Sequence, residues 1–67
     1  MSLEKERLSQ ELGATRVKIL EDVLRILAKK PEADQEKVYQ IIENFTESED
    51  RYTQNVGKYM MLSVAPN

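Results

Sequence analysis

Two glutamates stand where metal-binding or acid–base chemistry could begin. Glu43 and Glu47 lie four residues apart, so on a helix they project from the same face. Di-metal helical bundles arrange carboxylates in this way, but their helices also carry Glu-x-x-His pairs. The chain contains no histidine and no cysteine, which removes the commonest ligands of transition metals. We therefore interpret this pair as part of a solvated acidic face and expect no metal site.

The remaining catalytic signatures are also missing from the sequence. Without histidine or cysteine, no Ser-His or Cys-His nucleophile pair can form. The two glycines, Gly13 and Gly57, are too far apart to form a phosphate-binding loop. We expect no catalytic residue, no cofactor and no enzyme activity, and we look for a function in binding.

Residues 6–20 have the spacing of a short helix, a turn and a second helix. The apolar and glycine positions that set this spacing are Leu8, Leu12, Gly13 and Ile19. The segment resembles a helix-turn-helix DNA-binding motif, with the second helix starting near Thr15. The resemblance implies that Arg16 and Lys18 face phosphates or bases.

The match to this motif covers under a third of the chain. Asp22 stands where the motif has an apolar residue, and Glu21 adds a second negative charge beside it. DNA binding by residues 6–20 is therefore kept as an alternative. The alternative requires a sharp bend at Gly13, whereas the main prediction below runs one helix through it.

Pro31 divides the chain into two helical halves. It disfavours helical backbone at Lys30 and cannot continue a helix, and Asp34 is a good N-cap for the next one. Pro31 could also be the first helical residue, which would shorten the loop. Beyond it, a 4-3 spacing like that of a coiled coil joins Val38, Ile42, Phe45, Glu49, Tyr52, Val56, Tyr59 and Ser63. This spacing predicts one long helix from about residue 35 to about residue 63.

The first half carries a wider apolar face. On a helical wheel this face covers roughly half of the circumference, and it consists of Val17, Ile19, Leu20, Val23, Leu24, Ile26 and Leu27. One neighbouring helix covers a narrower stripe than that. We therefore expect this helix to contact at least two neighbours.

These patterns predict an all-α fold, a single domain over residues 1–67. We expect an antiparallel hairpin of two long helices at about 3–30 and 35–63, with a loop at about 30–35 and a short tail. In the register set by this loop, Val23 lies opposite Ile42, and Arg16 lies opposite Glu49. These two residues form an inter-helix polar pair or, as an alternative, both extend their charged ends to water. Two such hairpins would form a four-helix bundle.

Size and charge favour a protein partner. A chain of 67 residues without cysteine cannot use disulfides to stabilise its small core, which leaves oligomerisation or a partner. The net charge is −2, divided as +2 over residues 1–30 and −4 over residues 31–67. The charged start of the chain lacks the apolar stretch of a signal peptide, so we expect a cytoplasmic protein with neither membrane nor nucleic acid as partner.

The chain ends with the apolar residues Met60, Met61, Leu62 and Val64. Methionine adapts to varied partners, so we expect Tyr59 to Leu62 to form a docking patch. The alternative is a tail whose scattered apolar residues have no binding role. The full predicted partner or oligomer interface is Ile19, Val23, Ile26, Tyr52, Val56, Tyr59, Met60, Met61 and Leu62. We expect a homodimer or a complex with another protein, acting as an adaptor, regulator or assembly subunit. A fragment of a longer helical protein is a further alternative.

Overall fold

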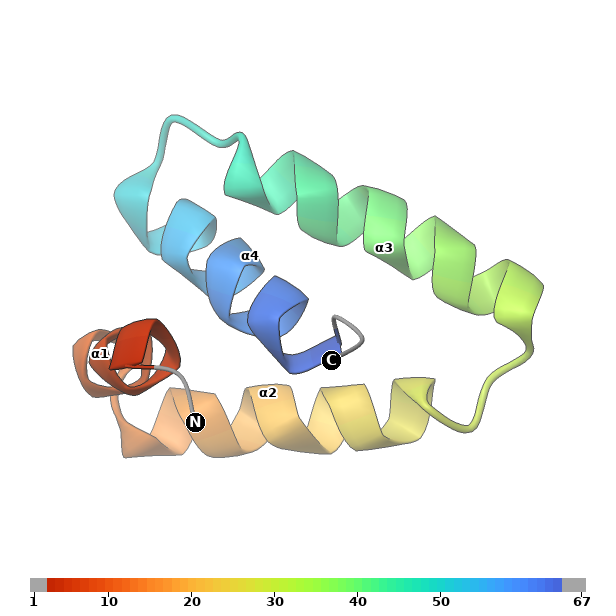
Figure 1. The fold of residues 1–67 in the computed structure, drawn as a ribbon, viewed down its shortest axis with the longest axis horizontal. Coiled ribbons are helices and arrows are strands. Elements are labelled where there is room, and N and C mark those ends of the chain that lie inside the picture. The colour runs from red at the N-terminus through yellow and green to blue at the C-terminus, as the bar shows by residue number, and fades with distance from the viewer. Residues whose placement is uncertain (1–2, 65–67) are drawn as a thin grey trace.

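The computed structural model describes residues 3–64, and this part of the chain is all-α (Figure 1). It contains four helices, α1 (Leu3–Leu12), α2 (Ala14–Leu27), α3 (Glu32–Thr46) and α4 (Arg51–Val64). The all-α prediction is confirmed. The prediction of two long helices is wrong, because each expected helix is divided into two.

The first helix is broken at Gly13. This residue has φ of 93°, a backbone conformation that glycine adopts without the steric cost of a side chain. Its N–H donates to the Ser9 carbonyl and its carbonyl accepts from the Val17 N–H, both at 3.0 Å, so both helices keep their terminal bonds. Figure 1 shows α1 almost end-on while α2 runs across the view. The chain therefore bends at the point where the two interpretations of the sequence differ.

The second expected helix is broken at residues 47–50. Asp50 Oδ2 accepts hydrogen bonds from the Thr53 N–H at 2.8 Å and from its hydroxyl at 2.7 Å, so Asp50 caps the start of α4. These two bonds hold the pKa of Asp50 below its ordinary value. The Asp50 N–H in turn donates to Ser48 Oγ at 3.1 Å. Local side-chain bonds of this kind compete with a continuous helix, and here they accompany the break that separates α3 from α4.

The predicted break at Pro31 is present, but the loop is shorter than expected. Pro31 occupies the N-cap position of α3, which begins at Glu32, and Asp34 lies in its first turn. The Gln35 amide reaches back and donates to the Lys30 carbonyl at 2.8 Å. The connection between α2 and α3 therefore spans residues 28–31.

The helix α4 lies at the centre of the packing. Its main contact is with α3, along which it runs back, and it also packs on α1 and α2. The helices α2 and α3 diverge from their connection with little direct contact, and α4 lies between them (Figure 1). The hairpin in this structure is therefore α3 with α4. The predicted pairing of Val23 with Ile42 is not formed, since Ile42 is buried and Val23 is exposed.

The core is small and brings all four helices together. Among the described residues, the buried apolar side chains are Leu8, Leu12, Val17, Ile42, Tyr59 and Met60. Leu8, Leu12, Val17 and Tyr59 form one cluster, with Leu20 and Val56 packed against it. This cluster joins α1, α2 and α4. The buried residue of α3 is Ile42.

Gly57 sets the distance between α3 and α4. A Cβ atom added at Gly57 would lie 2.7 Å from Phe45 Cβ and 2.7 Å from the Thr46 backbone nitrogen. Real Cβ atoms do not approach backbone so closely, so a larger residue would force the two helices apart. The close packing that glycine permits at this position therefore outweighs the poor helix propensity of the residue.

We predict that Gly57→Ala destabilises the protein. On an isolated helix this change would add stability of about 1 kcal/mol, because alanine is the better helix former. The clash with Phe45 and Thr46 should reverse the sign and cost about 1–3 kcal/mol. Urea unfolding followed by circular dichroism measures the difference. A more stable variant would show that α3 and α4 do not pack closely at this point.

Candidate interaction surface

The outer side of α2 carries a row of exposed apolar side chains. Ile19, Val23 and Ile26 are 56%, 39% and 61% exposed, and we name these three residues the α2 stripe. They are spaced four and three apart, so they share one side of the helix. The buried Val17 and the half-buried Leu20, Leu24 and Leu27 occupy the side that faces the other helices. The fold therefore covers only part of the wide apolar face, in line with the expectation that it needs more than one neighbour.

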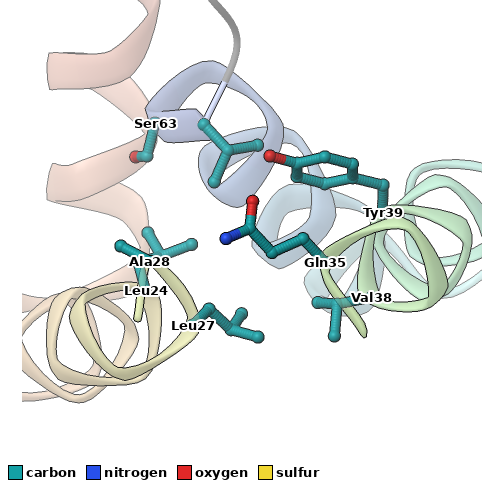
Figure 2. A pocket seen from close by; sticks show the side chains of 8 residues that line it. Leu24, Leu27, Ala28, Gln35, Val38, Tyr39 and Ser63 are labelled. Atoms are coloured by element: carbon teal, nitrogen blue, oxygen red, sulfur yellow. The ribbon is translucent and has the colours of Figure 1, made fainter. Parts of the chain in front are cut away.

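Two hollows lie where α2 and α3 diverge, each with α4 as its third wall. The first has a volume of about 270 Å³. Figure 2 shows Leu24 and Leu27 of α2, with Ala28 directly after this helix, on one side and Val38 and Tyr39 of α3 on the other. Gln35 and Ser63 add polar atoms to it, but the Gln35 amide already donates to Lys30 and the Ser63 hydroxyl to the Tyr59 carbonyl.

The second hollow lies near the start of α4 and is more apolar. Its volume is about 280 Å³, and it is lined by Arg16, Ile19, Leu20, Phe45, Tyr52, Thr53 and Val56. Ile19 belongs to the α2 stripe, so the stripe begins inside this hollow and continues along the outside of α2. Phe45 and Tyr52 are themselves exposed, which leaves two aromatic rings accessible from outside.

The predicted interface residues near the C-terminus have a different position from the α2 stripe. Tyr59 and Met60 are buried in the chain's own core, so they are not available to a partner in this structure. Met61 is half-buried and Leu62 is exposed. The predicted docking patch from Tyr59 to Leu62 is therefore divided between core and surface. The 4-3 spacing of the sequence includes Tyr59 among the apolar positions of one helix side. Its burial in α4 agrees with that spacing.

Arg16 is engaged with groups other than Glu49. Its Nη1 atom donates to the Leu12 carbonyl at 3.3 Å, which satisfies one backbone acceptor at the end of α1. Its guanidinium also lies 5.3 Å from the centre of the Tyr52 ring, within the range of a cation–π contact. The predicted pair of Arg16 with Glu49 is not among the interactions of residues 3–64, and Glu49 lies in the connection before α4.

Tyr59 forms a partly buried polar contact at the core. Its hydroxyl donates to Glu21 Oε1 at 3.2 Å and links α4 to α2. Burial raises the pKa of this phenol, and the negative charge of Glu21 and the hydrogen bond to it raise the pKa further. Lys5 Nζ lies 5.5 Å from the centre of the ring and adds α1 to the contact. The arrangement holds three helices together.

Neither carboxylate of the Glu43 and Glu47 pair takes part in a metal-binding cluster. Both are exposed, and the described residues contain no group of three acidic, histidine or cysteine side chains that could hold a metal ion. Between residues 3 and 64, no helix has the length and apolar character needed to cross a membrane.

Sequence reasoning did not include Ile41 and Phe45 in the interface. These two α3 residues are 51% and 37% exposed, and we name them the α3 stripe. Phe45 was assigned to the buried seam of a long helix, but in the structure it borders the open second hollow. Their spacing of four residues, which places both on one side of a helix, was the only feature of the sequence that could have indicated a shared exposed surface.

Comparisons of the chain with known protein families, with curated proteins and with solved structures find no match. The surface described above is therefore the basis for the functional proposal.

We predict that Tyr59→Phe lowers the free energy of unfolding at neutral pH by about 1 kcal/mol, because it removes the hydrogen bond to Glu21. A phenol whose pKa is raised by folding stabilises the folded state below the pKa of the unfolded chain, about 10. That contribution is lost as the pH rises through the raised pKa. Urea unfolding of both proteins from pH 8 to pH 11 should show their difference shrinking above about pH 10. A difference that stays constant would contradict this assignment.

Proposed function

We propose that this protein is a non-enzymatic, cytoplasmic interaction protein that acts by binding protein through the α2 stripe and the adjoining second hollow. The observation that carries the proposal is the exposure of Ile19, Val23 and Ile26 on one side of one helix. A contiguous apolar surface that the fold leaves uncovered is typical of an interaction site.

The chemistry of the surface supports an apolar and helical partner. The second hollow combines branched aliphatic side chains with the rings of Phe45 and Tyr52, and Arg16 lies over one of these rings. Aromatic residues and arginine contribute strongly to protein interfaces because they bury large areas while keeping a polar contact. A partner helix with apolar residues at spacings of three and four would match the α2 stripe. An adaptor, a regulator or an assembly subunit would use such a surface.

We predict that the double variant Ile19→Glu, Ile26→Glu loses binding while its helical content is retained. Both residues are exposed, so the charges do not enter the core, but a bound partner would bury them without counter-charges. Capture from the native lysate, identification of the bound protein and titration with that purified protein measure the effect. The control is Gln40→Glu, an exposed change on α3 that adds one negative charge outside the α2 stripe, whereas the double variant adds two within it. Equal binding by the wild type and the double variant would exclude the α2 stripe as the site.

DNA binding is a second candidate because the chain bends at Gly13, as the helix-turn-helix interpretation requires. In this candidate α2 is the recognition helix, and its exposed Lys18 lies close to the bend. The acidic Glu21 and Asp22 lie on the same helix and would repel phosphates, and Asp22 forms an ion pair with Arg25 at 3.0 Å.

We predict that the protein shows no sequence-specific binding to duplex DNA at physiological salt, because the basic residues of α2 are interrupted by these acidic ones. Fluorescence anisotropy with a pool of random duplexes, followed by sequencing of the bound fraction, tests this. Enrichment of one sequence, lost in Arg16→Ala and in Lys18→Ala, would favour the DNA-binding candidate over protein binding.

A further inference from the structure

The α2 stripe and the α3 stripe border the same hollow from opposite sides. Ile19 of the α2 stripe and Phe45 of the α3 stripe both line the second hollow, whose remaining wall is Tyr52 and Val56 of α4. The helices that carry the stripes diverge with little direct contact between them (Figure 1). An occupant of this region would therefore touch both stripes of one molecule.

The charged residues at the ends of the two stripes have opposite signs. The α2 stripe lies between Arg16 and Lys30, which are basic. The α3 stripe lies between Asp34 before it and Glu49 after it, which are acidic and exposed. Other acidic residues of α3, such as Glu43, lie on the far side of the helix. The ends of the α2 stripe of one molecule are therefore complementary in charge to the ends of the α3 stripe of an identical molecule.

We infer that the occupant is a second copy of this chain, in a two-fold dimer where the α2 stripe of each copy packs along the α3 stripe of the other. The inference rests on the proposed function and names its partner. A two-fold axis makes both contacts at once, because each copy supplies one α2 stripe and one α3 stripe. The contact pairs apolar with apolar and basic with acidic residues, and it gives α2 the additional neighbour that its wide apolar face needs.

The first test is the mass of the wild-type protein in solution. Sedimentation equilibrium between about 1 and 100 μM should give twice the 7.8 kDa mass of one chain. In the Ile19→Glu, Ile26→Glu variant the dissociation constant should rise at least about 100-fold, with helicity by circular dichroism unchanged. The Gln40→Glu control should remain a dimer. A wild type that stays monomeric over this range, or a double variant that still dimerises, would overturn the inference.

The second test determines which helices meet. The chain has no cysteine, so engineered cysteines are its only thiols. Equal amounts of Val23→Cys and Ile41→Cys, each with a different tag, are mixed and oxidised. The proposed contact should give a mixed disulfide between the two proteins in high yield. Glu43→Cys is the matched control, because this exposed residue lies about 200° around α3 from Ile41, and its yield with Val23→Cys should be at least about tenfold lower. Equal yields from the two α3 cysteines would overturn the arrangement.

The combined outcomes separate this inference from the proposed function. A monomeric wild type that still binds a purified protein partner, with binding lost in the stripe variant, refutes the second copy as occupant and leaves the function standing. A monomeric wild type whose capture of other proteins does not depend on the stripe refutes both.

Discussion

The close approach of α4 to α3 at Gly57 is the contact on which the rest of the structure depends. Without a side chain at this position, the α4 backbone can lie against Phe45 and Thr46, and the helix runs back along α3. This position brings the opposite side of α4, with Tyr59, to the cluster of Leu8, Leu12 and Val17. The contact therefore orders α1 and α2 as well, because both pack on α4.

A core built around one short helix leaves much apolar surface uncovered. Between residues 3 and 64 there are six buried apolar side chains and nine large apolar side chains that remain exposed. A domain of this size stabilises itself only marginally, and burial of further apolar area by a partner is the physical route that remains in a chain without disulfides. The uncovered face of α2 thus follows from the small size of the domain, and it is the surface that the proposed function would use.

The two helix breaks show where sequence reasoning succeeded and where it did not. Pro31 was found from the sequence because proline constrains its neighbour whatever the tertiary context. The break at residues 47–50 was missed because the 4-3 apolar spacing continues across it through Glu49. The side chains of Ser48 and Asp50 were the local signal, since both accept backbone hydrogen bonds at the start of α4. At Gly13 the sequence allowed a helix or a bend, and only the packing of α1 against α4 selects the bend.

The sequence by itself determined the all-α class, the break at Pro31, the excess apolar width of α2 and the absence of histidine and cysteine chemistry. Each of these follows from composition or from periodicity along the chain, which do not depend on what lies beside a helix. Only the tertiary structure decided which helices pair, because the seam residues Val38 to Ser63 fit either one long helix or two short ones folded together. It also decided that Tyr59 and Met60 are core while Ile41 and Phe45 are surface, since burial depends on which helix the chain folds against each face.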